Sequence, residues 1–139
     1  MDDRNMLVLI PTYNERENVQ ELCERILAIG LDLDILFMDD NSPDGTGDVL
    51  DELAMKYPNM HVIHRHGKLG IGSAHQEGIK WAYENKYKIL ITMDCDFTHP
   101  PEHIPDLIKS SENCDIAVGS LYMMKDSLEG WNILRKFMT

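Results

Sequence analysis

Short apolar runs alternate with segments of helical periodicity along this chain, and this alternation restricts the possible folds more than any other feature of the sequence. The strands that these runs predict fall at residues 6–10, 35–38, 60–64, 88–93 and 115–119. Between them, apolar side chains recur every three or four residues, which is the spacing of one helix face. Strands that alternate with helices of this length predict an α/β fold with a Rossmann-like, doubly wound and mainly parallel sheet.

Capping residues and prolines predict where several of these elements begin and end. Asn14, with Glu17 three residues later, has the pattern of a capping box and predicts the start of the first helix. Gly30 follows the last apolar residue of that helix and predicts its end. Pro11 predicts the end of the first strand, and the prolines at 100–101 predict the start of a later helix.

Size and charge limit the class of protein. A chain of 139 residues has the usual size of one domain, so we expect residues 1–139 to form a single unit. Its formal net charge of -11 would repel a nucleic-acid backbone and argues against a nucleic-acid partner. An acidic site can still bind a phosphate group if a divalent cation neutralises its carboxylates.

Two further observations predict a soluble, cytoplasmic setting. The longest apolar run, at residues 6–11, is too short to span a bilayer, and the first residues are unlike a signal peptide. Cys23, Cys95 and Cys114 are odd in number and far apart, without the spacing of a zinc site, which favours reduced thiols.

Polar residues follow three of the predicted strands at their carboxyl ends. These residues are Thr12 to Glu15, the pair Asp39-Asp40, and the segment from Asp94 to Asp96. In open parallel sheets, ligands bind in the crevice at the carboxyl ends of the strands. We therefore expect these three segments to lie together around one ligand site.

Asp94 and Asp96 form a pair of carboxylates separated by one residue. Carboxylates this close repel each other unless a cation lies between them, and hard oxygen ligands favour Mg²⁺ or Mn²⁺. The alternative is that Asp96 is a helix N-terminal charge ahead of Pro100 while Asp94 is a solvated turn residue. Their position after a buried strand, together with two other acidic or polar strand ends, favours the metal site.

Asp40 and the glycine-rich loop after residue 64 are further candidates for ligand binding. Asp40 is followed by Asn, Ser, Pro, Asp and Gly, which predict a turn whatever the function, but a carboxylate at a strand end can also accept hydrogen bonds from a nucleobase or a ribose. Arg65 and Lys68 could bind a diphosphate, or they could be ordinary surface charges. The loop matches neither a P-loop nor a dinucleotide fingerprint.

Taken together, these motifs resemble the family 2 glycosyltransferases of GT-A fold, and within them the dolichol-phosphate mannosyltransferase-like polyprenyl-phosphate glycosyltransferases. The resemblance runs in the family's order through residues 9–18, 38–46, 65–74 and 93–96. It implies a nucleoside-diphosphate-sugar site in which Asp94 and Asp96 are the catalytic and metal-binding carboxylates. The residues implied to bind the donor are Pro11, Tyr13, Glu15, Met38, Asp40, Arg65, Lys68, Asp94, Cys95 and Asp96.

The resemblance also implies a reaction. A hexose of the mannose or glucose type would move from a GDP- or UDP-sugar to a polyprenyl phosphate, such as dolichol or undecaprenyl phosphate, with inversion and with Mg²⁺ or Mn²⁺. A phosphate acceptor is already an anion, so no strong general base is needed, and the main requirement is a cation that stabilises the departing diphosphate. A lipid acceptor would bring the chain to the cytoplasmic face of a membrane.

Two departures from the family pattern bear on this interpretation. Leu121 follows Gly119-Ser120 where the family often has an arginine that contacts phosphate, and Thr98 stands where some members have a glutamine near the metal. The family also continues beyond the segment at 131–136, so the chain resembles its front half. The alternative is therefore a nucleotide-sugar-binding or assembly module without the acceptor half.

A second alternative comes from another class of enzyme. Residues 94–98 satisfy the DxDxT pattern of haloacid-dehalogenase-like phosphatases, in which the first Asp is a nucleophile and the second a general acid. Those enzymes carry the motif on the first strand, with a lysine and an acidic pair far downstream. Here the motif follows the fourth predicted strand, which favours the glycosyltransferase.

Overall fold

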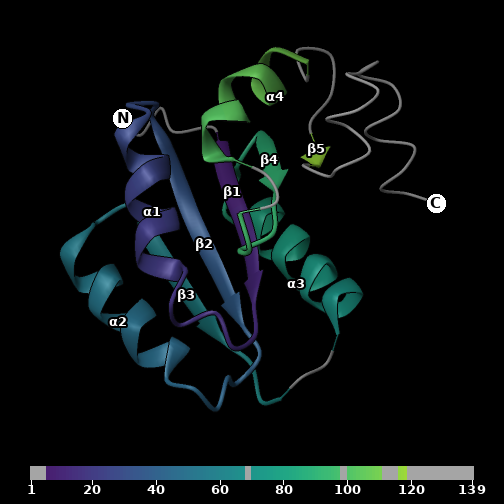
Figure 1. The fold of residues 1–139 in the computed structure, drawn as a ribbon. Coiled ribbons are helices and arrows are strands. Elements are labelled where there is room, and N and C mark those ends of the chain that lie inside the picture. The colour runs from purple at the N-terminus through teal and green to yellow at the C-terminus, as the bar shows by residue number, and fades with distance from the viewer. Residues whose placement is uncertain (1–5, 68–69, 98–99, 111–115, 119–139) are drawn as a thin grey trace.

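The computed structural model describes residues 6–67, 70–97, 100–110 and 116–118, and these form one parallel sheet with helices on both faces (Figure 1). The sheet has five strands in the order β3-β2-β1-β4-β5, and every neighbouring pair is parallel. The elements are β1 (Met6–Thr12), α1 (Val19–Ala28), β2 (Leu33–Asp39), α2 (Thr46–Lys56), β3 (Met60–His64), α3 (Ile71–Glu84), β4 (Ile89–Thr92), the 3-10 helix η1 (Pro101–His103), α4 (Ile104–Ser110) and β5 (Ile116–Val118). The predicted doubly wound parallel sheet is confirmed.

Alternate residues of the central strands supply two separate hydrophobic cores. On one face, Val8 and Ile10 of β1 and Ile35 and Phe37 of β2 pack with apolar residues of α1, α2 and α4. On the other face, Leu7, Leu9, Leu36 and Met38 pack against Ala74 and Ala82 of α3. Because side chains alternate along a strand, a strand buried on both faces is continuously apolar, which explains the uninterrupted runs in the sequence.

Helix α3 packs very close to β1 at Gly78. A Cβ atom at this position would lie only 2.3 Å from Cδ2 of Leu9. The glycine therefore permits a close approach of helix and strand, and this contact fixes the height of α3 above the sheet.

Strand β1 is longer than the sequence predicts, because Pro11 lies inside it and not at its end. Pro11 pairs with Met38 of β2, and β1 continues to Thr12. The peptide groups of Leu9 and Pro11 face β4, where Leu9 O accepts a hydrogen bond from Met93 N, but the ladder with β4 ends at the pair Leu9–Thr92. The missing N–H of Pro11 therefore falls beyond the last rung and leaves no hydrogen bond unmade.

The first helix also begins later than the sequence predicts. Asn14 is not its N-cap: its φ is 57°, in the left-handed region, and α1 starts at Val19 after Asn18. The intervening turn is closed by Glu15 O, which accepts hydrogen bonds from Asn18 N and Val19 N. The helix ends at Ala28, two residues before Gly30, whose φ is 81°, so the predicted stop at this glycine is confirmed. None of the helices in the described part of the chain is long and apolar enough to cross a bilayer.

Candidate nucleotide and metal site

A cavity of about 300 Å³ lies at the carboxyl ends of β1, β2 and β4. This is the point at which the strand order reverses, since β2 and β3 lie on one side of β1 while β4 and β5 lie on the other. Open α/β sheets bind ligands at such switch points. The cavity is lined by Pro11, Thr12, Tyr13, Glu15, Asp40, Gly70, Ala74, Asp94, Cys95 and Asp96.

The cavity brings together most of the residues that the sequence singled out. Seven of the ten lie in its wall, and they come from all three polar strand ends. Of the other three, Met38 is fully buried in the core against α3, Arg65 is buried behind Asp40, and Lys68 lies outside the described residues, as do Thr98 and Leu121. Gly70 and Ala74, which the sequence did not single out as ligand contacts, supply the wall on the α3 side.

The loop that carries Tyr13 and Glu15 is held by the loop that follows β2. Ser42 Oγ accepts a hydrogen bond of 2.9 Å from Asn14 N, and Thr46 Oγ1 accepts one of 3.1 Å from Glu15 N. Asp44 Oδ2 accepts a third, of 3.2 Å, from Arg16 N. Three successive backbone N–H groups are thus satisfied by side chains about thirty residues away in sequence. These contacts place Glu15 in the cavity wall, and they explain why Asn14 does not cap α1.

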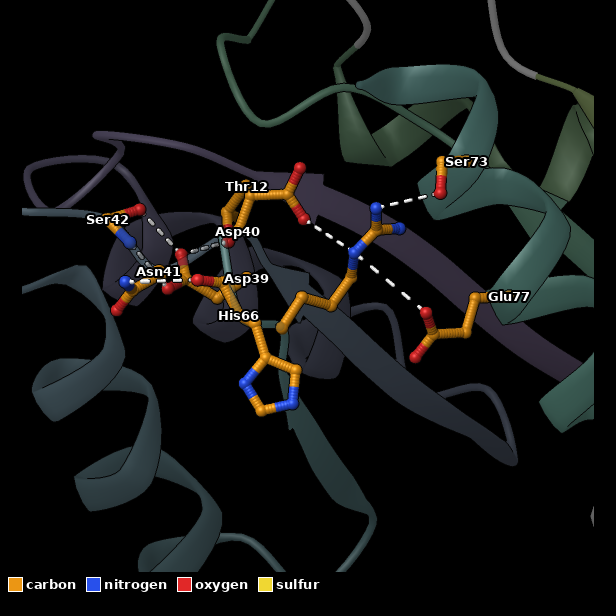
Figure 2. Close-up of polar contacts among 9 residues, drawn as sticks. Thr12, Asp39, Asp40, Asn41, Ser42, His66, Ser73 and Glu77 are labelled. Atoms are coloured by element: carbon orange, nitrogen blue, oxygen red, sulfur yellow. Dashed lines mark hydrogen bonds and ion pairs between the residues drawn. The ribbon is translucent and has the colours of Figure 1, made fainter. Parts of the chain in front are cut away.

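Asp39 holds the ends of β1 and β2 together from the face of the sheet that α1 and α2 cover. Its carboxylate accepts hydrogen bonds from Thr12 Oγ1 at 2.8 Å, from Ser42 Oγ at 2.7 Å and from Ser42 N at 3.1 Å (Figure 2). Asp39 is only 1% exposed and does not line the cavity. Its role in the structure is to fix the turn from which Asp40 projects.

Asp40 lines the cavity and has a cationic neighbour. Arg65 Nε lies 2.9 Å from Asp40 Oδ1, and both side chains are almost entirely buried. Arg65 Nη2 also donates a hydrogen bond of 2.9 Å to Ser73 Oγ on α3. Because Arg65 does not line the cavity itself, Asp40 stands between the guanidinium group and the ligand space.

Carboxylates gather at the opposite end of the cavity. The pKa of Glu15 is raised above its ordinary value, first because of burial and then because of the negative charges of Asp96, Asp44 and Asp94, although a hydrogen bond from Asn18 opposes the rise. Burial, together with the negative charges of Glu15, Asp96 and Asp94, raises the pKa of the Cys95 thiol well above its usual range. The local field is therefore strongly negative, and it favours a cation.

The turn after Asp96 is supported from α1 and η1. Phe97 has a φ of 62°, a conformation that bulky side chains rarely adopt. The guanidinium carbon of Arg25 lies 5.1 Å from the centre of its ring, and Arg25 Nε donates a hydrogen bond of 3.0 Å to Glu102. These contacts hold the turn in a conformation that a free chain would disfavour.

Asp94 and Asp96 fit a divalent cation that takes most of its ligands from elsewhere. In the part of the chain that the structure describes, no three His, Cys, Asp or Glu side chains are grouped so as to hold a metal. Asp94 is half-buried and Asp96 exposed, and both border the cavity. A pair of carboxylates at the edge of an open cavity is the donor set with which Mg²⁺ binds together with water and substrate phosphates.

Comparison with known proteins gives a consistent picture. The model of the family "Glycosyl transferase family 2" matches residues 7–137. Curated relatives include the undecaprenyl-phosphate mannosyltransferase of Micrococcus luteus (37% identity over 134 residues, 96% of this chain and 55% of that protein) and the polyprenol monophosphomannose synthase of Mycolicibacterium smegmatis (41% over 127 residues, 90% and 48%). A dolichol-phosphate mannosyltransferase of Pyrococcus furiosus is 44% identical over 135 residues (95% and 37%). The chain thus spans roughly half the length of these relatives or less.

Solved structures share the fold. A mannosyltransferase of Pyrobaculum calidifontis in complex with GDP-Man and Mn²⁺ superposes with a TM-score of 0.64 at 22% identity, over 76% of this chain and 31% of that one. TarS of S. aureus superposes with a TM-score of 0.61 at 23% identity, over 78% and 32%. Both likenesses establish the GT-A fold for this chain.

Proposed function

The chain belongs to glycosyl transferase family 2, and we propose that it forms the donor-binding part of an enzyme that transfers a hexose from a nucleoside-diphosphate sugar to a polyprenyl phosphate. On this proposal residues 1–139 are a single nucleotide-sugar-binding domain. The family membership decides against the phosphatase alternative for residues 94–98.

The observation that carries this proposal is the arrangement of the cavity at the switch point of the sheet. Pro11, Tyr13 and Asp40 border one part of it, and Asp94 and Asp96 border another. A nucleoside diphosphate has the same division, with an uncharged base and ribose joined to a charged diphosphate. We propose that Tyr13 and Asp40 contact the nucleoside and that Asp94 and Asp96 hold the diphosphate through a cation.

A divalent cation, Mg²⁺ or Mn²⁺, would neutralise the carboxylates and stabilise the negative charge that develops on the departing diphosphate. Asp94 and Asp96 would be its ligands in this chain. Glu15 would orient the donor from the neighbouring wall; its pKa is raised first by burial and then by the nearby carboxylates, whose charge the cation would offset. The complex of the Pyrobaculum mannosyltransferase with GDP-Man and Mn²⁺ supports both the type of donor and the use of a metal.

The proposed acceptor explains why so few catalytic side chains are needed. A polyprenyl phosphate is an anion that can attack the anomeric carbon without a general base, on the face opposite the diphosphate, so that the configuration inverts. The curated relatives are named as undecaprenyl-, polyprenol- and dolichol-phosphate mannosyltransferases or synthases, which supports this acceptor class and a mannosyl donor. Such an acceptor would place the enzyme at the cytoplasmic face of a membrane.

Titration of the chain with GDP, UDP and their sugars, with and without Mn²⁺, tests the site. We expect calorimetric binding that depends on Mn²⁺ and falls at least tenfold in Asp94→Asn and Asp96→Asn, because each loses a charged metal ligand. Asp48→Asn, on the exposed side of α2, is the matched control and should bind as the wild type does. If no nucleotide binds, or if the site variants bind equally well, the site assignment is wrong.

Transfer is tested separately from binding. Radiolabelled mannose from GDP-mannose should appear on a polyprenyl phosphate in detergent or vesicles when the chain is supplied in its full-length context. If a folded chain binds the donor tightly but transfers no sugar in any context, the binding or assembly module becomes the better interpretation.

A further inference from the structure

Arg65 is a buried arginine at the end of β3, next to the proposed nucleoside site. Its side chain is only 2% exposed and that of Asp40 only 8%. The guanidinium group contacts Asp40 Oδ1 at 2.9 Å through Nε, Ser73 Oγ at 2.9 Å through Nη2, and Glu77 Oε1 at 3.9 Å. Figure 2 shows Ser73 and Glu77 reaching from α3 toward the end of β2, where Asp40 lies. One arginine therefore connects β2, β3 and α3.

The backbone of Arg65 is fixed as firmly as its side chain. Arg65 N donates a hydrogen bond of 2.8 Å to Asp39 O, so the residue extends the parallel pairing of β2 and β3 by one step. Strand alternation then sends Arg65 to the same face of the sheet as Asp40, the face covered by α3. The guanidinium group contacts Asp40 without lining the cavity itself.

The hydrogen bonding of Arg65 is incomplete. Nε lies at ion-pair distance from Asp40, but its N–H is not aligned for a hydrogen bond, and Nη1 is buried without a hydrogen-bond partner in the described segments. Burying a guanidinium group in this way is unfavourable compared with an apolar side chain of similar size. Buried polar groups that are incompletely satisfied call for a functional explanation.

We propose that Arg65 is a positioning residue for Asp40: it holds that carboxylate toward the nucleoside of the donor and ties it to the first turns of α3. This inference rests on the proposed function of the cavity. Because the guanidinium group balances the charge of Asp40, the carboxylate serves as a hydrogen-bond acceptor and not as a second ligand for the cation. The divalent cation is thereby directed to Asp94 and Asp96, at the other end of the cavity.

The proposal differs from direct contact between Arg65 and the diphosphate, and the two make different predictions. An arginine that acts through Asp40 affects only ligands that carry a nucleoside. An arginine that binds the diphosphate affects inorganic pyrophosphate as well. Calorimetry with Mn²⁺ and either inorganic pyrophosphate or the nucleoside diphosphate that the wild type prefers, GDP or UDP, therefore separates them.

Arg65→Met should weaken binding of the nucleoside diphosphate roughly 10- to 100-fold, the range expected when the hydrogen bond from the nucleoside to the charged Asp40 is lost. Binding of pyrophosphate should stay within about twofold of the wild type. Asp40→Asn should weaken the same ligand. The double variant should be no weaker than the weaker single variant, because both substitutions remove one interaction. Arg65→Lys keeps the charge but not the planar fork, so it should recover part of the affinity.

Lys56→Met, on the exposed surface of α2, controls for the loss of one positive charge and should bind both ligands normally. Circular dichroism checks that each variant is folded. If Arg65→Met does not fold, the comparison uses Arg65→Lys and Ser73→Ala, which weakens the link to α3 while the arginine remains.

The outcomes are distinct. Equal losses for pyrophosphate and the nucleoside diphosphate would show that Arg65 binds the diphosphate and would overturn the proposal. Additive losses in the double variant would show that Arg65 acts independently of Asp40 and would also overturn it. If the wild type binds neither GDP nor UDP, the proposed function fails, whereas a wild type that binds and an Arg65→Met variant that binds equally well refute only the positioning role.

Discussion

Thr46 is the residue on which the position of Glu15 most depends, and its replacement by valine gives a specific test of the loop contacts. The hydroxyl group of Thr46 is fully buried. It accepts a hydrogen bond from Glu15 N and donates one to Asp44 Oδ1. Valine has nearly the same shape but can do neither, so Thr46→Val removes two contacts without leaving a cavity.

The expected loss of stability follows from these two contacts. Leaving the N–H of Glu15 without an acceptor costs about 1–2 kcal/mol, and losing a hydrogen bond to the partly solvated carboxylate of Asp44 costs about 1 kcal/mol more. We therefore expect the free energy of unfolding to fall by about 2–3 kcal/mol at pH 7. For a chain of this size the midpoint temperature should fall by about 8–12 °C.

The loss should also depend on pH. Burial would raise the pKa of Asp44, but hydrogen bonds from the Thr46 hydroxyl, Thr46 N and Arg16 N outweigh it and lower this pKa below its ordinary value of 3.8. A lowered pKa in the folded state stabilises the protein above the unfolded pKa, and this stability is lost as the pH falls through the folded pKa. The destabilisation by Thr46→Val should therefore shrink progressively as the pH falls below 3.8 toward the lowered pKa of Asp44, leaving in the limit the roughly 1–2 kcal/mol of the Glu15 contact.

Urea denaturation followed by circular dichroism at pH 7, 4 and 3 measures this difference. Thr46→Ser is the matched control, because it keeps the hydroxyl and loses only a methyl group, at about 1 kcal/mol, so its effect should not change with pH. Nucleotide affinity should fall in Thr46→Val and not in Thr46→Ser. If both variants lose the same stability at all three pH values, the hydroxyl does not make the contacts described, and the reasoning fails.

Three further predictions concern the packing, the charge and the thiols of the site. Gly78→Ala should lower the free energy of unfolding by about 1–2 kcal/mol, because overpacking against Leu9 outweighs the roughly 1 kcal/mol gain in helix propensity. Leu9→Ala in the same chain should reduce this loss, as a double-mutant cycle measured by urea denaturation would show. Glu15→Gln should raise the stability of the ligand-free chain at pH 7 while weakening Mn²⁺-dependent nucleotide binding. Because the pKa of Glu15 is raised, the wild type should gain stability as the pH falls through that pKa toward 4.5, and the variant should lack this gain in the same titration. Alkylation with iodoacetamide at pH 8, read by peptide mass spectrometry, should modify Cys95 only as fast as the chain unfolds, because its raised pKa and burial keep the thiol protonated and covered; rapid labelling of the folded chain would contradict this.

The fold could be predicted from the sequence because its signals are local. Strands β1, β2 and β4 each contain a continuous apolar run, and β3 begins and ends at the residues that the sequence predicted. The predicted start of α1 was wrong because it depends on a contact that is distant in sequence. Asn14 has a good local capping pattern, but its backbone is held by Ser42, twenty-eight residues away, in a conformation that a capping residue does not adopt. A local propensity of about 1 kcal/mol is easily overridden by such a tertiary contact.

The location of the candidate site could be predicted from the sequence, but the hydrogen bonds that hold its loops could not. The convergence of the strand ends follows from a parallel sheet, whose carboxyl ends must lie at one edge. The hydrogen bonds of Ser42, Asp44 and Thr46 could not be foreseen, because a turn rich in such residues is expected whether or not it holds another loop. The burial of Arg65 was also hidden, since a charged residue in a glycine-rich loop is ordinarily exposed.

One regularity of strands nevertheless determines which side chains reach the site. On β2, Leu36 and Met38 face α3, so Asp40 must follow them to that face, whereas Asp39 follows Phe37 to the face of α1 and α2. The neighbouring aspartates therefore have different roles: Asp40 lines the cavity, and Asp39 holds the ends of β1 and β2 together.

The same count applies to the adjacent strands. Because residues two or four positions apart share a face, Pro11 follows Leu9 to the α3 face of the sheet. Asp94 follows Leu90 of β4 to the same face, and Arg65 follows Ile63 of β3. Pro11, Asp40, Asp94 and Arg65 thus share one parity relative to the core, whereas Thr12 and Cys95, which also line the cavity, have the other. Inserting a single residue within β2 ahead of Asp39 would exchange the faces of the sheet on which Asp39 and Asp40 lie, so nucleotide binding should be lost. Binding should survive only if the whole apolar pattern of the strand shifted with the insertion.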